Sequence, residues 1–196
     1  MTDIIIQKGS TWTKVVRWEK LPFIFTPITA ISRAAPAVIT APGHNLVTGQ
    51  RAFATGAGGM RRINAKKMPP YLSDFHKVIA MDASRVQFND VDSTNYTAYT
   101  SGGSLGVYTP APLAGANARM QIRETVESPD PALVSLVSPT DIVIDDTAHT
   151  ITITISDAAT AALTFATGVY DLEVVIGGVV TQLLHGNVTV LPEVTR

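Results

Sequence analysis

The sequence predicts an all-β protein in which a small β-barrel module is inserted into an antiparallel β-sandwich, after the first strands of the sandwich. Two observations favour strands over helices. Isoleucines and threonines alternate in "TITITIS" at residues 150–156, and short apolar runs separated by Gly, Pro, Asn or Asp recur along the chain. A third observation, a middle segment rich in Ala, Gly and Pro, indicates that a second unit interrupts the first.

The N-terminal strands come first. The chain opens with three short apolar runs, "DIIIQKG", "TKVVRW" and "PFIF", which are too few for a stable sheet of their own. We expect them to complete the sheets of a later segment, so that residues 1–26 and 107–196 form one discontinuous sandwich. Its predicted core consists of Ile4, Ile6, Val16, Ile122, Ile151, Ile153, Ile155 and Val174.

Residues 27–106 hold most of the turn signals and are predicted to form the inserted barrel module. We expect a tight turn at Gly43-His44-Asn45, a hairpin around Asp82-Ala83-Ser84, and a short helix or loop that ends at Pro69-Pro70. The module should have a core of its own, built from Val38, Ile39, Phe53, Ile79, Val86 and Phe88.

The C-terminal third shows the clearest strand pattern. Ile151, Ile153 and Ile155 should face a core while the threonines between them face solvent. A short strand at residues 142–144 precedes this stretch, and Ser156 should cap a helix of about two turns after it. Three further strands are expected, with turns at Gly177-Gly178 and near His185-Gly186-Asn187.

Composition removes several classes of function. The 196 residues carry a net charge of −1, so no global field favours nucleic acid or an anionic membrane as a partner. Without cysteine there is no disulfide, no thiol catalysis and no thiolate metal site. No signal peptide or membrane-spanning run is recognisable, so we expect the chain in the cytoplasm or in an assembly made there.

One hydrolase-like motif occurs, but its context is wrong for catalysis. Residues 102–106 match the nucleophile pattern G-x-S-x-G around Ser104, and Asp146 with His149 or His185 follows in the hydrolase order. The nucleophile of that class needs a strand-to-helix turn, whereas the following residues 107–110, "VYTP", cannot open a helix. We therefore expect a Gly-rich turn and no enzymatic activity.

We also expect neither a metal nor a cofactor. Residues 89–94 resemble the start of a calcium loop, but Asn95 replaces the required glycine and Ser101 the required glutamate, so a capped turn is the better interpretation. The histidines lack paired metal spacing and are interpreted as ordinary surface residues; they are His44, His76, His149 and His185. A basic cluster is interpreted as a solvated or salt-bridging loop; it comprises Arg61, Arg62, Lys66 and Lys67.

A family resemblance goes further than composition. The stretches "ARMQIRETVESP", "IVIDDTAHTITITISDAATAAL" and "GVYDLEVVIGGVVTQLLHGNVTVLPEVTR" resemble small phage virion proteins. Their domain is similar to the immunoglobulin-like N-terminal domain of phage baseplate upper proteins. The inserted segment, with "HKVIAMDASRVQFNDVDSTNYTAYTSGG", resembles a barrel module of phage tail proteins named for the first catalytic cysteine half-domain of ubiquitin-activating enzymes. Without cysteine, that name implies no activity here.

The resemblance implies an immunoglobulin-like sandwich and a non-enzymatic structural role in a bacteriophage virion, in the tail or baseplate. The implied partners are other phage virion proteins, met as many copies in a symmetric assembly. One alternative is a host-adhesion or carbohydrate-binding module of the tail tip that binds a surface glycan through exposed aromatics, Tyr71, Phe75, Tyr96 and Tyr99. A weaker alternative is a capsid decoration protein.

Overall fold

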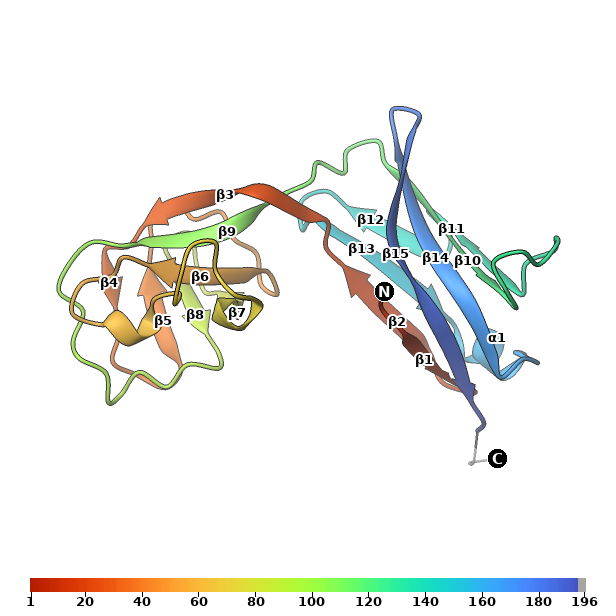
Figure 1. Cartoon of the computed structure of the whole chain (residues 1–196), viewed down its shortest axis with the longest axis horizontal. Coiled ribbons are helices and arrows are strands. Elements are labelled where there is room, and N and C mark those ends of the chain that lie inside the picture. The colour runs from red at the N-terminus through yellow and green to blue at the C-terminus, as the bar shows by residue number, and fades with distance from the viewer. Residues whose placement is uncertain (194–196) are drawn as a thin grey trace. The chain divides into compact units, whose positions relative to one another are not determined.

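The computed structural model describes residues 1–193 and shows the all-β fold that the sequence predicts (Figure 1). The chain divides into two compact units. The first unit combines Met1–Trp18 with the chain from Ala111 onward, and the second unit is the inserted segment Glu19–Pro110. Each unit has its own hydrophobic cluster, so the two are described separately.

The unit boundaries differ from those expected at residues 26 and 107. Two strands, β3 (Glu19–Pro27) and β9 (Ser104–Pro110), were divided between the units in the sequence-based prediction. In the structure they pair antiparallel along their length, from Glu19 opposite Pro110 to Pro27 opposite Ser104, and both belong to the inserted unit. Because β3 and β9 pair with each other, both belong wholly to the inserted unit. The unit boundaries therefore lie at residues 18 and 111.

The described part of the first unit is a sandwich of two sheets. A five-stranded sheet has the order β1-β15-β14-β10-β11, and a three-stranded sheet has the order β12-β13-β2. The pairs are antiparallel except β1 with β15, which run parallel. The strands are β1 (Ile4–Gln7), β2 (Trp12–Val16), β10 (Asn117–Arg123), β11 (Val134–Val137), β12 (Ile142–Asp145), β13 (Thr150–Ile155), β14 (Thr167–Ile176) and β15 (Val179–Leu191).

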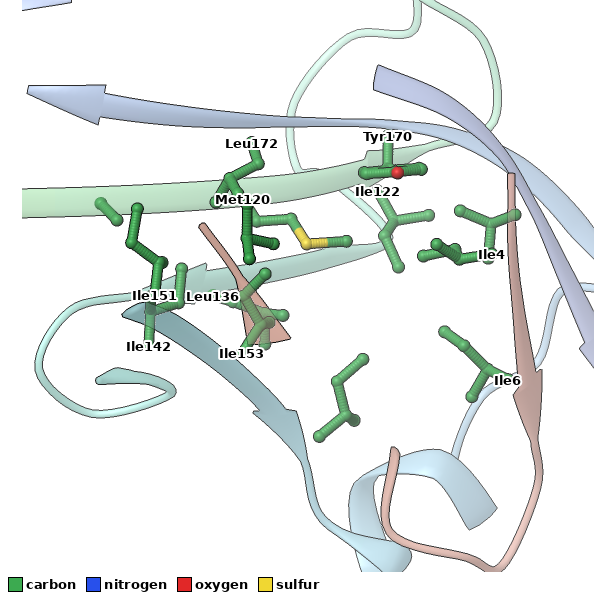
Figure 2. Close-up of a cluster of buried hydrophobic side chains, with 14 of the residues drawn as sticks. Ile4, Ile6, Met120, Ile122, Leu136, Ile142, Ile151, Ile153, Tyr170 and Leu172 are labelled. Carbon is green, nitrogen blue, oxygen red and sulfur yellow. The ribbon is translucent and has the colours of Figure 1, made fainter. Parts of the chain in front are cut away.

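Alternating apolar side chains from both sheets fill the space between them (Figure 2). Ile151 and Ile153 of β13 are fully buried, as are Ile122 of β10 and Leu172 of β14. All eight residues predicted for this core are buried in it, because strict alternation leaves one face of each strand apolar. The helix α1 (Asp157–Ala161) also begins as expected: Ser156 Oγ accepts a hydrogen bond from Ala159 N–H at 3.2 Å.

The predicted turn near His185-Gly186-Asn187 is wrong, because β15 continues through it. Gly186 serves a different purpose: a Cβ there would lie 2.4 Å from the Thr2 carbonyl oxygen. The missing side chain lets the N-terminus approach, so that Thr2 N–H donates to His185 O at 2.9 Å and Tyr170 Oη donates to Thr2 O at 2.6 Å. Burial of Tyr170, with a smaller contribution from the Asp3 carboxylate, raises the pKa of its hydroxyl.

The inserted unit is a curled antiparallel sheet with the order β3-β9-β6-β7-β8-β5-β4 in the described chain. Only residues 28 and 29 separate β3 from β4, so one bent stretch of chain supplies both ends of the sheet and closes it into a barrel. Its other elements are β4 (Ala30–Ile31), β5 (Ala37–Thr40), β6 (Arg51–Thr55), β7 (His76–Ala80), β8 (Arg85–Phe88) and the 3₁₀ turns η1 (Arg61–Ile63) and η2 (Leu72–Asp74).

The barrel core was predicted only in part. Ile39, Val86 and Phe88 are fully buried in it, whereas Ile79 is exposed and Val38 is half-buried. In the pairs Val38-Ile39 and Val78-Ile79, the two neighbouring side chains point to opposite faces of the sheet. Only one residue of each pair therefore enters the core. Phe53 is buried, but on the outer face of the barrel.

Candidate interaction surface

The four aromatics expected to form an exposed platform do not form one. Phe75 is buried, and its ring packs 5.1 Å from the ring centroids of both Phe53 and Tyr108. The Tyr99 side chain is held in place by a hydrogen bond, which its hydroxyl donates to Ile28 O at 2.9 Å. Ring–ring contacts within the described residues do not join any two of the four.

Cations of the basic cluster lie over the rings of the other two platform residues, of which Tyr71 is still exposed. The Lys67 Nζ lies 4.1 Å from the ring centroid of Tyr71, and the Arg62 guanidinium carbon lies 4.4 Å from that of Tyr96. Each pair is a cation–π contact in which the aromatic face is occupied. Two members of the basic cluster therefore stack on tyrosines, and all four members are exposed, as expected for a solvated loop.

Sequence reasoning missed an aromatic cluster on the outer face of the barrel. Phe23 and Phe25 of β3 pack at 5.2 Å and 6.0 Å, respectively, from the ring of Phe53, and Tyr108 stacks on Phe75 with an interplanar angle of 8°. The alternation of Phe23 and Phe25 was a detectable signal. Only the pairing of β3 with β9, which joins residues far apart in sequence, shows what they pack against.

Ser104 lies at the first position of β9, opposite Pro27 and Thr55 of the neighbouring strands. The strand-to-helix turn of a hydrolase nucleophile is therefore replaced by a continuous strand. Asp146 belongs to the first unit, where its Oδ1 accepts a hydrogen bond from Leu113 N–H at 2.6 Å.

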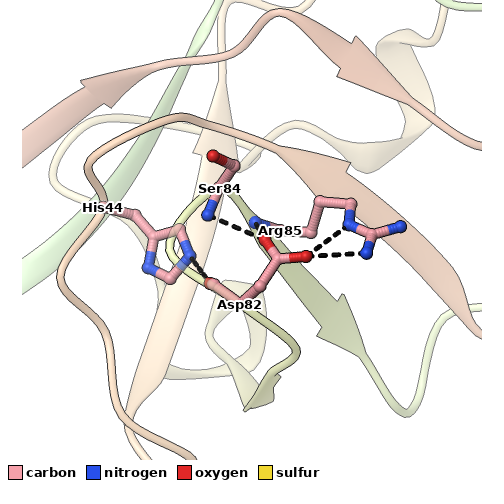
Figure 3. Close-up of polar contacts among 4 residues, drawn as sticks. All are labelled: His44, Asp82, Ser84 and Arg85. Carbon is pink, nitrogen blue, oxygen red and sulfur yellow. Dashed lines mark hydrogen bonds and ion pairs between the residues drawn. The ribbon is translucent and has the colours of Figure 1, made fainter.

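His44 corrects the expectation of four surface histidines, because its side chain is buried (Figure 3). Its Nδ1 accepts a hydrogen bond from Leu46 N–H at 2.9 Å, so Nε2 carries the proton and donates to Asp82 O at 2.9 Å. The neutral ring thus joins the loop after β5 to the turn between β7 and β8. Of the others, His185 is exposed and His76 is half-buried, stacked on Phe88.

The turn between β7 and β8 is the hairpin predicted around Asp82. The Asp82 carboxylate accepts hydrogen bonds from Ser84 N–H and Arg85 N–H at 2.9 Å, and from Arg85 Nε at 2.7 Å (Figure 3). The Arg85 side chain, followed by the Ser84 amide, holds the pKa of this carboxyl below its usual range. The group is a structural cap at the protein surface.

The partial calcium motif is arranged as a capped turn. Asp92 Oδ1 accepts hydrogen bonds from Thr94 N–H at 2.9 Å and Thr94 Oγ1 at 2.6 Å, which lowers the pKa of the Asp92 carboxyl. Asp90 is engaged elsewhere, with His76 Nδ1 2.9 Å from its Oδ1. Among residues 1–193, no group of three or more His, Asp or Glu side chains is placed to hold a metal ion.

A depression lies on the outer face of the five-stranded sheet, and one of its lining cations, Arg123, is already paired. Arg123 bridges to Asp130 and donates to Ser128 O at 2.8 Å. The depression is lined by Gln121, Arg123, Val126, Val169, Tyr170, Asp171, Gln182 and His185. Arg123 is thus committed to its neighbours, and Asp171 Oδ2 accepts a hydrogen bond from Gln182 Nε2 at 3.4 Å.

The outer face of the three-stranded sheet has a different character. Val143, Thr152 and Val15 are direct cross-strand partners in one row over β12, β13 and β2. The two valines are 57% and 58% exposed, respectively. The next row pairs Thr13 with Thr154, so uncharged β-branched side chains form the centre of this face. We call Thr13, Val15, Val143, Thr152 and Thr154 the β-branched face.

Together, the fold and these surfaces define a two-unit all-β protein in which the β-branched face groups two exposed valines with three threonines. Compared with known proteins, the chain matches no family model and no curated protein sequence. None of the helices in its described part has the length and hydrophobicity needed to cross a bilayer.

Proposed function

We propose that this chain is a non-enzymatic structural component of a bacteriophage virion, in the tail or baseplate, and that it works through protein–protein contacts of its sandwich. The resemblance of its sandwich and barrel sequences to phage virion and tail proteins supports this role. The observation that carries the contact surface is the row of Val143, Thr152 and Val15, in which both valines are exposed.

The physical argument starts from the cost of leaving this face in water. Burying one valine side chain contributes about 1.5–3 kcal/mol, so covering Val15 and Val143 favours association. Apolar residues that gather on an exposed sheet face mark an interaction site, since leaving them uncovered promotes aggregation.

The alternative of a glycan-binding module gains no support from the four aromatics named for it. Phe75 is buried, a cation lies over the ring of Tyr71 and another over that of Tyr96, and no ring contact of the described residues joins two of the four. The test below also separates the proposal from adhesion at the tail tip and from capsid decoration, since each role puts the chain in a different part of the particle.

The experiment locates the chain in virions of the phage that encodes it, by mass spectrometry and an electron cryomicroscopy map. We expect a ring of copies about the tail axis. Density at peripheral tips would favour adhesion, density over the shell would favour decoration, and absence of the chain from virions would overturn the proposal. The double variant Val15→Lys/Val143→Lys should fold but fail to enter virions.

The matched control is Val126→Lys, which adds the same charge at a valine that is 84% exposed in the loop between β10 and β11. This variant should enter virions like the wild type. If the double variant has the wild-type melting temperature and still enters virions normally, the contact lies outside the β-branched face.

A further inference from the structure

The hairpin formed by β14 and β15 extends past its neighbouring strand and ends in an uncharged tip (Figure 1). β10 pairs with β14 only as far as Val175, beyond which Ile176 pairs with Val179 alone. Val179 and Val180 are 67% and 49% exposed. Residues 174–184, "VVIGGVVTQLL", contain no charged side chain at all.

One edge of this hairpin has unpaired backbone. On the side of β15 away from β14, β1 pairs only with residues 188–191, and Thr2 N–H reaches His185 O. No strand of the described chain pairs with residues 179–184 on that side. Alternate N–H and C=O groups of an antiparallel strand point away from its partner, so this stretch presents a row of available donors and acceptors.

Other sheet edges in the described chain carry features that discourage strand addition. β3 contains Pro22 and Pro27 and begins with Glu19, while β2 carries Lys14 and β12 ends in Asp145. Prolines and charges on an edge strand block pairing with other chains. β11 lacks both, but it is only four residues long. β1 (Ile4–Gln7) and β4 (Ala30–Ile31) are also uncharged and free of proline, but they have only four and two residues. The edge at residues 179–184 is longer than these, uncharged, free of proline and continuous with an exposed apolar tip.

We propose that two copies of this chain pair through this edge, with β15 antiparallel to β15 of the second copy about a two-fold axis near Thr181 and Gln182. An antiparallel edge is self-complementary in its hydrogen bonds, which is the requirement for an isologous contact. The absence of charge means that no like charges oppose each other across the axis. A charged partner would find no complementary charge here, whereas a second copy also covers the exposed valines.

The inference rests on the proposed function only in that both require the chain to act through protein–protein contacts; it identifies one partner as a second copy. The pairing would join two five-stranded sheets edge to edge into one continuous sheet. It uses residues separate from the β-branched face, so both contacts are available to one copy at once.

The test uses the purified full chain. Sedimentation equilibrium should show a concentration-dependent dimer, and hydrogen exchange should show protection of amides in residues 179–184 that increases with dimer fraction. Val180→Lys should weaken self-association about tenfold or more, because each copy then brings a like charge to the contact. Val180→Thr keeps a β-branched, uncharged side chain and should still dimerise, and Val126→Lys should behave as the wild type.

A chain that stays monomeric throughout overturns the inference, as does a dimer that survives Val180→Lys with residues 179–184 unprotected. Protection of these amides only after another virion protein is added also overturns it and assigns the edge to that protein. A monomer that still enters virions would refute the self-pairing alone, and a dimer absent from virions would refute the proposed function alone.

Discussion

The ring of Phe53 lies against the Cα atom of Gly106, its cross-strand partner in the pairing of β6 with β9. A Cβ atom on Gly106 would lie 2.3 Å from Phe53 Cζ, far inside van der Waals contact. On the other side of β9, Phe25 of β3 pairs with the same glycine, and its ring meets that of Phe53 edge to face. The glycine thus gives the outer aromatic cluster room to close over β9.

The first prediction concerns this contact. Gly106→Ala should destabilise the inserted unit by about 1–3 kcal/mol, because the Phe53 ring must leave its place between two strands. Urea unfolding followed by aromatic fluorescence or near-UV circular dichroism would measure the change. Phe53→Leu should absorb part of the penalty, so the double variant should lose less stability than the two single losses added together. Simple additivity would contradict the contact.

The second prediction concerns the buried imidazole of His44. His44→Ala removes hydrogen bonds to Leu46 N–H and Asp82 O, and should lower the free energy of unfolding by about 1–3 kcal/mol. The loss should appear in chemical denaturation of the full chain. His185→Ala, at an exposed position, is the control and should change stability by no more than about 0.5 kcal/mol. Equal effects of the two substitutions would refute the assigned role.

The third prediction concerns the acid titration of the turn between β7 and β8. The pKa of Asp82 lies below its ordinary value of 3.8, chiefly because of Arg85. The stabilisation is therefore fully present above pH 3.8 and is lost as the pH falls through the lower, folded-state pKa. Arg85→Gln should raise the pKa of Asp82, as read from its carboxyl carbon shift in an NMR titration. The pKa of Asp92, lowered by Thr94, should not move.

The fourth prediction tests whether the two cores are independent. Replacing residues 19–110 by a short Gly-Ser linker between Trp18 and Ala111 should leave a folded sandwich, since its buried residues all come from the first unit. Loop length changes closure entropy by only about 0.6 kcal/mol per doubling. Cooperative melting and dispersed amide resonances should persist. A truncated chain that aggregates, or gives collapsed spectra, would show that the cores depend on each other.

Where apolar and polar residues alternate, the sequence was sufficient to predict both the strand and its buried face. The alternation through Ile151, Ile153 and Ile155 specified both the strand and its buried face, because a strand with one wet face admits only one such arrangement. The pattern could not predict which residue is buried in the pairs Val38-Ile39 and Val78-Ile79. Two adjacent apolar residues fit either face, and only the neighbouring strands determine which enters the core.

The remaining differences come from contacts between distant parts of the chain. Gly186 resembles a turn residue in sequence, and its use for close approach of Thr2 depends on residues 184 positions away. His44 resembles a turn residue too, and its hydrogen bond to the backbone oxygen of Asp82 depends on a residue 38 positions away. The exposed valine row requires the register of β12, β13 and β2, which the sequence of any one strand does not contain. These features involve pairing partners that local propensity cannot identify.

The pairing of the first and last strands of the inserted unit has a consequence for how the protein can evolve. Glu19 and Pro110 are opposite one another in β3 and β9, and immediately outside them Ala111 N–H donates to Trp18 O at 2.8 Å. The host sandwich thus holds the two junctions side by side. Because the two junctions are neighbours, we expect the sandwich to accept another module whose ends are adjacent antiparallel strands in place of the barrel.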